Sequence, residues 1–267
     1  MTKSNFLASL RRGIVQLRQW RYPTPPDNLV RRGSCDFERT GKEFFRYFTE
    51  LGNLSKKENV LDVGCGCGRM AVPLTDYLSE EASYCGFDIM TDSIRWCQKH
   101  ISPKHPNFNF IRVDVFNKRY NPAGKVSASN FKFPYQNDFF DFVLLTSVFT
   151  HMLPGDMEHY LSEIVRVSKA GSKSLITFFL LNRDSIELIN DKKSTLDFQY
   201  IRNAYRTIND DEPEAAIAYD EAYIRSLYEK YGLRIVEPIH YGNWCGRTNF
   251  LSYQDIIVAL KMGTSEA

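Results

Sequence analysis

Residues 60–69 read Val-Leu-Asp-Val-Gly-Cys-Gly-Cys-Gly-Arg, and this stretch decides the fold expected for the chain. An apolar strand runs into three glycines at alternate positions, where bare backbone lets a ligand approach closely. A helix expected over residues 69–78 would aim its free N–H groups at that ligand, which suits a carboxylate or a phosphate. The Gly-x-Gly-x-Gly spacing differs from the Gly-x-Gly-x-x-Gly of dinucleotide sites, and the Gly-Lys-Ser/Thr end of a P-loop is absent.

Strands and helices alternate from this stretch onward. The strands are expected at residues 59–64, 84–89, 108–113, 140–147 and 174–181. The helices are expected at residues 69–78, at 91–100 with Thr91 or Asp92 as N-cap, and at 156–169. The unbroken apolar run Phe142–Leu145 is typical of a central parallel strand that is covered on both faces.

The last part of the chain predicts a change of strand direction. A helix over residues 220–231 ends before Gly232, and β runs follow at residues 233–241 and 250–260. The loop 242–249 between them is short enough for an antiparallel hairpin. We therefore predict an α/β fold, doubly wound, with a Rossmann-like seven-stranded sheet that is parallel except for one reversed strand in the C-terminal hairpin.

Four segments follow from this pattern. They are a basic N-terminal arm or lid (1–34), an α/β core (35–181), an irregular insert or lid over the acceptor site (182–218), and a C-terminal helix and hairpin that complete the same sheet (219–267). The arm carries seven basic residues and one acidic residue, with Phe6, Leu10, Ile14 and Leu17 at helical spacing. This arm either lies on the main domain or contacts an anionic membrane surface.

Composition excludes several classes of protein. The 267 residues carry a formal net charge of +2, with 43% hydrophobic and 25% charged residues, which is typical of a globular chain and gives no overall nucleic-acid signature. No apolar stretch is long enough for a transmembrane helix, and residues 1–20 lack the apolar core of a signal peptide. The six cysteines form no C-x-x-C pair, so we expect reduced thiols, a cytoplasmic protein and no metal site.

Two acidic residues come at the ends of successive predicted strands. Asp88 ends the second strand, where a carboxylate can accept both hydroxyls of an adenosine ribose. Asp114 follows the third strand and can accept from an adenine amino group. Together with the glycine stretch, these residues predict an adenosine site at the carboxyl ends of the strands.

The stretch Leu61–Arg69 resembles motif I of the class I S-adenosylmethionine-dependent methyltransferases, of the bacterial small-molecule or glycan type. Asp88 matches the ribose-binding acid of that family, and Phe140–Val143 with Thr146–Met152 matches its fourth strand and the following turn. The resemblance implies a methyltransferase with S-adenosyl-L-methionine as cofactor, and implies that Gly33–Gly41 closes over the amino-acid end of the cofactor. The cofactor contacts that it implies are Asp62, Gly64, Cys65, Gly66, Gly68, Arg69, Asp88, Ile89, Asp114, Val115, Ser147 and Val148.

Methyl transfer to a hydroxyl benefits from a base, and His151, just after the fourth strand, is the first candidate. His240, near the end of the sixth strand, is the second. Aromatic and polar residues in the insert and near the hairpin are candidate acceptor contacts. They are Phe198, Tyr200, Tyr205, Trp244, Arg247 and Tyr253. Residues 244–255 resemble those of uncharacterised bacterial methyltransferases linked to glycan or secondary-metabolite pathways.

We expect methylation of a small-molecule acceptor, at a hydroxyl of a sugar, a glycan or a secondary metabolite. An RNA or protein methyltransferase, a non-catalytic protein that binds S-adenosylmethionine, and a nucleotide-dependent oxidoreductase remain alternatives. A DNA amino-methyltransferase is disfavoured because Thr146-Ser147-Val148-Phe149 stands where such enzymes carry an Asn/Asp-Pro-Pro-aromatic motif. The acceptor, the choice between oxygen and nitrogen, and the oligomeric state stay open.

Overall fold

A computed structural model describes residues 24–30 and 36–263 of the chain. Most of the predicted N-terminal arm, including its apolar helical positions and its membrane contact, lies outside the described residues. A seven-stranded sheet forms the centre, with strand order β10-β11-β5-β4-β1-β2-β3. The strands are β1 (Val60–Val63), β2 (Tyr84–Asp88), β3 (Phe108–Arg112), β4 (Phe140–Leu145), β5 (Ser168–Phe178), β10 (Leu233–Ile235) and β11 (Asp255–Lys261).

The strand directions confirm the predicted topology. β1 pairs in parallel with β2 and β4, and the parallel pairing continues to β3 on one side and β5 on the other. β11 is antiparallel to both β5 and β10, so it is the reversed strand of the sheet. This is a doubly wound, Rossmann-like α/β sheet, and its parallel strands place their carboxyl ends along one edge.

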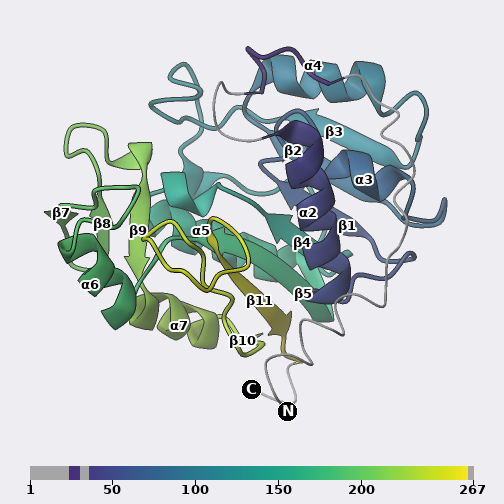
Figure 1. Cartoon of the computed structure of the whole chain (residues 1–267). Coiled ribbons are helices and arrows are strands. Elements are labelled where there is room, and N and C mark those ends of the chain that lie inside the picture. The colour runs from purple at the N-terminus through teal and green to yellow at the C-terminus, as the bar shows by residue number, and fades with distance from the viewer. Residues whose placement is uncertain (1–23, 31–35, 264–267) are drawn as a thin grey trace.

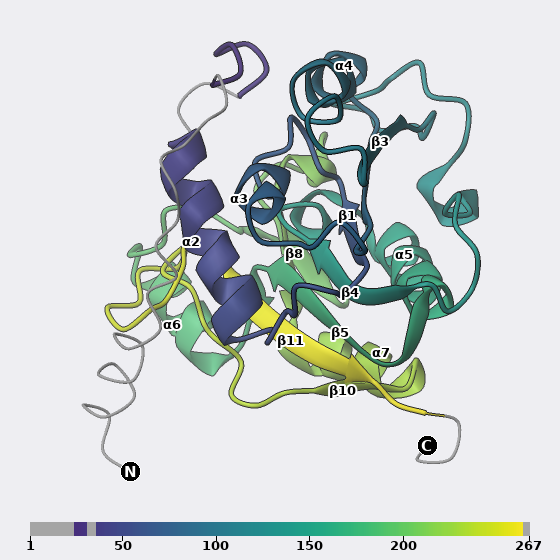
Figure 2. The ribbon, with the colours of Figure 1, turned by 90° about the vertical axis from the view of Figure 1, so that its right-hand side faces the viewer.

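Helices cover both faces of the sheet (Figures 1 and 2). One layer contains α2 (Phe37–Glu50), α3 (Ala71–Thr75) and α4 (Thr91–His100), which bury apolar side chains against one sheet face. The opposite face is covered by α5 (Pro154–Val167) and α7 (Glu221–Lys230). Two hydrophobic layers therefore hold the central strands, which explains the continuous apolar run at Phe142–Leu145, where every side chain is buried.

The helix α2 was not predicted. Its sequence contains no motif, and its helical signal is the gathering of apolar residues on one face. Asp36 is the N-cap and accepts a hydrogen bond from the Arg39 N–H at 2.9 Å. Phe37, Phe45 and Phe48 lie on its buried face. The predicted bounds of α4 are confirmed. Its N-cap is Met90, however, and not Thr91 or Asp92 as predicted. The Met90 N–H donates to Asp88 Oδ1.

The insert 182–218 is more ordered than its polar clusters predicted. It contains the helix α6 (Arg183–Asn190), the strands β7 (Tyr200–Ile201) and β8 (Tyr205–Thr207), and the start of β9 (Ile217–Asp220). With β6 (Leu180–Leu181) these strands form a small sheet in the order β6-β9-β8-β7. The expected irregular segment was therefore wrong, because pairing with β6 and β9 satisfies the backbone of a polar stretch that lacks a strand pattern of its own.

The C-terminal hairpin has a longer connection than predicted. β10 ends at Ile235 and β11 begins at Asp255, so residues 236–254 form the connection instead of 242–249. An isolated antiparallel bridge joins His240 of this connection to Ile256 of β11. This connection returns Ser252, Tyr253 and Gln254 to the edge of the sheet where the site lies.

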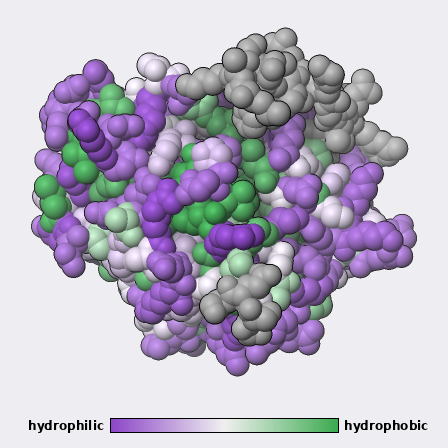
Figure 3. Space-filling model, turned by 90° about the horizontal axis from the view of Figure 1, so that it is seen from below, coloured by the Kyte–Doolittle hydropathy of each residue, from purple (hydrophilic) through white to green (hydrophobic). Residues whose placement is uncertain are grey.

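Large apolar side chains are scattered over the described surface. The exposed ones are Ile111, Phe116, Val126, Ile201, Val236, Phe250 and Tyr253. One face is mostly hydrophilic, with hydrophobic residues gathered near its middle (Figure 3). Among the described residues, no helix is both long and apolar enough to cross a membrane.

Candidate active site

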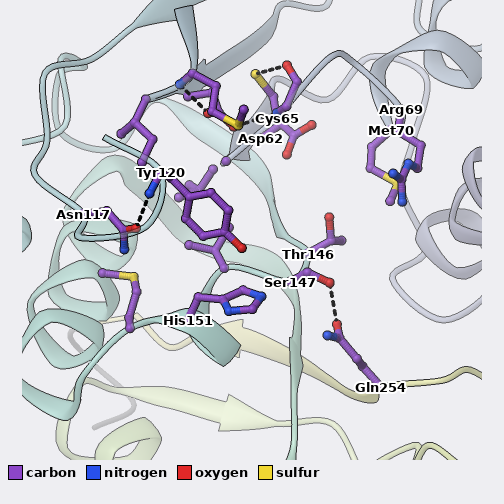
Figure 4. A pocket seen from close by; sticks show the side chains of 18 of the residues that line it. Asp62, Cys65, Arg69, Met70, Asn117, Tyr120, Thr146, Ser147, His151 and Gln254 are labelled. Atoms are coloured by element: carbon purple, nitrogen blue, oxygen red, sulfur yellow. Dashed lines mark hydrogen bonds between the residues drawn. The ribbon is translucent and has the colours of Figure 1, made fainter. Parts of the chain in front are cut away.

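A cavity of about 760 Å³ lies at the carboxyl ends of β1, β2 and β4. Residues from the glycine stretch line one side, and residues after β3 and β4 line another (Figure 4). Twelve of the predicted site residues line this cavity. They are Asp62, Gly64, Cys65, Gly66, Arg69, Asp88, Ile89, Val115, Ser147, Val148, His151 and Tyr253.

The glycine loop is shaped by positive backbone angles. Gly64 has φ +77°, and a Cβ there would lie 2.4 Å from Val148 Cγ2, so only glycine fits against the turn after β4. Gly66 has φ +52°, and a Cβ there would meet nothing within 4 Å, so its backbone stays open toward the cavity that it lines. The loop therefore packs against Val148 at Gly64, whereas its backbone at Gly66 is uncovered and faces the cavity.

Asp88 holds the glycine loop in place. Its Oδ2 accepts from the Gly66 N–H at 2.8 Å, and its Oδ1 accepts from the Met90 N–H at 2.8 Å. Hydrogen bonds from backbone N–H groups to a carboxylate are stronger than neutral ones. Each oxygen keeps a second lone pair, so the same carboxylate can also accept from the hydroxyls of a ribose.

Asp62 is fully buried, and one of its oxygens needs a partner. Tyr84 donates to Oδ2, whereas Oδ1 has no hydrogen-bond partner. Burial, together with the nearby Asp88 charge, raises the pKa of Asp62 to about 7 against the lowering effect of the Tyr84 hydrogen bond. An unpaired buried carboxylate oxygen that lines the cavity fits the ammonium group of a methionine moiety.

Two arginines stand at the same end as Asp62. Arg69 follows the glycine loop and lies over the Phe37 ring, with the guanidinium carbon 5.7 Å from the ring centroid. Arg39 comes from α2, and both arginines line the cavity. Arg69 lies apart from Asn117 and Tyr120 in Figure 4. Their charges suit the carboxylate of a methionine moiety.

Ser147 marks the turn after β4. Its φ of +57° is unusual for a residue with a Cβ, and such backbone conformations concentrate at functional sites. The surroundings hold it there: its N–H donates to Thr177 Oγ1 at 2.8 Å, and its Oγ donates to Gln254 Oε1 at 2.9 Å. Gln254 therefore connects the C-terminal segment to the turn beneath the cavity (Figure 4).

His151 belongs to a group of residues at the other end of the cavity. Its Nδ1 lies 2.9 Å from the Glu214 carbonyl oxygen, and its ring meets the Tyr120 ring edge to face at 5.8 Å. A carbonyl oxygen only accepts, so Nδ1 carries the proton and the neutral ring has its lone pair on Nε2. The Asn117 side-chain amide donates to Glu214 Oε1 at 2.9 Å.

Two segments meet above this group, and we call them the clasp: Asn117–Arg119 after β3, and Asp211–Glu214 in the insert. Besides the Asn117 bond, Lys118 Nζ donates to the Asp211 carbonyl oxygen at 2.9 Å. Arg119 and Glu212 form an ion pair at 3.5 Å. The clasp joins parts of the chain that are more than 90 residues apart.

The structure places the remaining predicted cofactor and base residues outside the cavity. Gly68 packs against α4, where a Cβ would lie 2.7 Å from Ile101 Cδ1. Asp114 forms an ion pair with Arg112 at 2.8 Å instead of lining the cavity. His240 forms the bridge to Ile256, and burial lowers the pKa of its ring.

The predicted acceptor residues other than Tyr253 also lie outside the cavity. Trp244 and Phe198 are fully buried in a separate hydrophobic cluster, with their rings edge to face at 5.3 Å. Trp244 donates to the buried Asp255 at 2.8 Å, and Arg247 approaches the same carboxylate at 3.6 Å. Tyr200 and Tyr205 belong to the strands of the small sheet.

Several cavity residues escaped the sequence analysis. They are Glu43, Asn117, Tyr120, Asp156, Glu214 and Gln254, whereas Arg39 and Thr40 belong to the stretch Gly33–Gly41 that the family resemblance implied over the amino-acid end of the cofactor. Asp156, in the first turn of α5, had a weak signal, because an acid at that place stabilises a helix N-terminus whether or not it binds a ligand. The others become visible only when distant segments are brought together.

Comparison with known proteins identifies the family. A family model described as a methyltransferase domain matches residues 54–229, which is more than half of the chain. The chain belongs to this methyltransferase family. S-adenosylmethionine is its methyl donor, and the orphaned Asp62 oxygen, the open backbone at Gly66 and the two arginines fit that group.

Solved structures show the same fold at low sequence identity. A protein from Pyrococcus horikoshii is 17% identical, with 89% of this chain and 96% of that chain covered and a TM-score of 0.56. A SAM-dependent methyltransferase from Methanosarcina mazei is 19% identical, with 79% and 96% covered and a TM-score of 0.52. The magnesium protoporphyrin IX methyltransferase of Synechocystis, with bound SAH, is 15% identical, with 88% and 91% covered and a TM-score of 0.53.

Proposed function

We propose that this methyltransferase transfers the methyl group of S-adenosylmethionine to a hydroxyl of a small molecule, such as a sugar, a glycan unit or a secondary metabolite. The observation that carries this proposal is the placement of His151 at the cavity, with Nδ1 held by the Glu214 carbonyl oxygen. That contact leaves Nε2 as the basic nitrogen of the neutral ring.

Different residues would bind different parts of the donor. Arg39 and Arg69 would hold its carboxylate, Asp62 its ammonium group and Asp88 its ribose, while Gly66 contributes bare backbone. Ser147 and Val148 would lie beneath the reacting centre, because they line the cavity at the turn after β4. Holding donor and acceptor in one cavity replaces a bimolecular encounter and supplies up to roughly 7–11 kcal/mol of the barrier.

When bound, S-adenosylmethionine supplies a methyl group on a positively charged sulfur, which makes that carbon open to attack. The proton that the acceptor hydroxyl loses when its oxygen takes the methyl group would pass to Nε2 of His151. His151 is therefore the proposed base, and the Glu214 carbonyl oxygen orients it.

Two other features support the finer parts of the proposal. The cavity lining contains more acidic than basic side chains, which disfavours a phosphate-rich acceptor such as RNA. The five described cysteines are free and buried, which fits a reducing compartment such as the cytoplasm.

The test combines a label and two variants. Purified protein is incubated with methyl-labelled S-adenosylmethionine and neutral, cationic and anionic hydroxylated acceptors, and the label is expected in a base-stable ether. His151→Asn should lower kcat by about 10²–10⁴-fold while calorimetric affinity for S-adenosylhomocysteine stays the same. His105→Asn is the matched control, because His105 lies outside the cavity lining. Unchanged turnover in His151→Asn would show that His151 is not the base.

A further inference from the structure

The charges along the cavity are unbalanced. Its described lining contains five acidic side chains and two arginines. The acidic ones are Glu43, Asp62, Asp88, Asp156 and Glu214, and the basic ones are Arg39 and Arg69. The donor itself carries two positive charges and one negative charge, so it offsets only part of the acidic excess. Three of the acids, Glu43, Asp156 and Glu214, have no role in the donor contacts proposed above, and Glu43 already accepts a hydrogen bond from the Tyr47 hydroxyl on its own helix.

Asp156 and Glu214 line the cavity together with His151, whose ring contacts the Glu214 carbonyl oxygen. Burial raises the pKa of both carboxyl groups, and the Asp156 charge raises that of Glu214 further. Ser129 lowers the pKa of Asp156 through hydrogen bonds, and Lys118 lowers that of Glu214. The His159 charge also lowers the pKa of Asp156, but neither carboxyl group forms an ion pair with any of the described side chains, so no cation in direct contact compensates either charge.

The nearest basic side chains of the clasp are engaged elsewhere. Lys118 Nζ donates to the Asp211 carbonyl oxygen, and Arg119 pairs with Glu212. Neither of them lines the cavity. The two arginines that do line it belong to α2 and to the glycine loop, and Arg69 lies well apart from Asn117 and Tyr120 (Figure 4).

Aromatic rings accompany the two carboxyl groups. Tyr120, Tyr160 and Tyr253 line the same cavity, and Tyr120 lies against the His151 ring. Tyrosine faces attract cations, and aromatic rings combined with carboxylates are a common way to bind an ammonium group. Ring faces and uncompensated carboxylates therefore point independently to a cationic ligand.

We infer that the acceptor is a hydroxylated small molecule that also carries an amine, with its ammonium group against Asp156 and Glu214 and its hydroxyl toward His151. An amino sugar and a phenolic amine both have this chemistry. The inference rests on the proposed function, because it names the acceptor class for the same cavity. Acceptors that carry a phosphate or a carboxylate are disfavoured, since like charges at short range repel strongly in a half-buried site.

The experiment uses matched probes that differ only in charge. One set is methyl glucosaminide, methyl glucoside and methyl glucuronide; the other is tyramine, tyrosol and 4-hydroxyphenylacetate. Binding to the full-length protein saturated with S-adenosylhomocysteine is measured by calorimetry. In at least one set the amine should bind at least tenfold more tightly than the neutral probe, and the anion should bind most weakly.

Variants connect this preference to the two residues. Asp156→Asn with Glu214→Gln keeps hydrogen-bonding shape but removes both charges, and the preference for the amine should fall to within about twofold. Glu187→Gln is the control, because Glu187 pairs with Arg183 on the exposed surface of α6, outside the cavity lining, and the preference should stay. Equal binding of amine and neutral probes, tighter binding of the anions, no binding of any probe, or an undiminished preference in the double variant would overturn the inference. Saturation by S-adenosylhomocysteine is measured first, so failure of donor binding is seen separately.

Discussion

The two ends of the cavity are built in different ways. At the donor end, the contacts come from neighbouring parts of the chain, such as Asp88 with the Gly66 and Met90 backbone. At the acceptor end, the contacts join distant segments, such as Asn117 with Glu214 and Ser147 with Gln254. Local backbone geometry thus fixes where the donor binds, whereas long-range packing fixes what can be methylated. Substitutions at the two ends should accordingly have different effects on donor and acceptor.

The largest effect is expected from Gly64→Ala. The new Cβ would lie 2.4 Å from Val148 Cγ2, and its φ of +77° strains any residue with a side chain. Affinity for S-adenosylhomocysteine, measured by calorimetry, should fall more than a hundredfold. Gly171→Ala has a similar φ of +76° but nothing within 4 Å of the Cβ and lies away from the cavity, so it should leave affinity unchanged. Equal losses in both variants would show that strain alone, and not the loop, is responsible.

Asp88→Ala should come next. It removes the carboxylate that holds the Gly66 and Met90 N–H groups, at about 1.5–3 kcal/mol for one charge-assisted bond, which corresponds to roughly 10–100-fold in donor affinity. Asp114→Ala is its matched control, because Asp114 pairs with Arg112 outside the cavity. A comparable loss of donor affinity in Asp114→Ala would show that Asp114 contributes to donor binding.

The third prediction concerns pH. The free protein holds Asp62 with a pKa of about 7, and a bound ammonium group favours the ionised carboxylate. Affinity for S-adenosylhomocysteine should therefore rise by up to about tenfold from pH 6 to pH 8, with release of a proton on binding. Calorimetry in buffers of different ionisation enthalpy measures both quantities. Asp62→Asn should remove the pH dependence, and a wild-type affinity that is flat across this window would contradict the assignment.

The smallest effect is expected at the clasp. Asn117→Ala removes one hydrogen bond to a Glu214 carboxylate oxygen at the cavity; because water can replace the lost donor, we expect a cost of about 0.5–1.5 kcal/mol and an acceptor KM raised two- to tenfold. Donor affinity should stay within twofold. Arg119→Ala breaks only a partly exposed ion pair and should change the acceptor KM less. A loss of donor affinity in Asn117→Ala would mean that the two ends of the cavity are not separate.

The donor end could be predicted from sequence because its signals are local. Three features indicate a backbone geometry within a few residues each: the glycine spacing, the apolar run before Asp62, and the acid that ends β2. The strand directions, parallel except for one reversed strand, followed from the alternation of strands and helices and from the predicted C-terminal hairpin. The α2 arginine lies in the stretch Gly33–Gly41 that the resemblance implied, but it was not singled out because nothing in its immediate sequence separates a ligand contact from a solvated helix position.

The acceptor end could not be predicted in the same way. Trp244 and Phe198 have the residue types of an acceptor platform, but they are buried against each other, because aromatic side chains serve a core as well as a binding site. Glu214 lies in the insert expected as a lid over the acceptor site, but nothing in its local sequence singled it out, and the contact with Asn117 holds it at the cavity. Side-chain type alone does not reveal which face of a loop turns inward.

The two described tryptophans give each end of the cavity its own natural fluorophore. Trp96 lies against Phe37 at the start of α2, with ring centroids 6.3 Å apart, on the donor side. Trp244 is bonded to Asp255 beneath the segment that carries Tyr253 and Gln254. With Trp20 also replaced by phenylalanine, emission from Trp96→Phe and Trp244→Phe proteins therefore separates an optical signal of donor loading from one of acceptor arrival, without any attached dye.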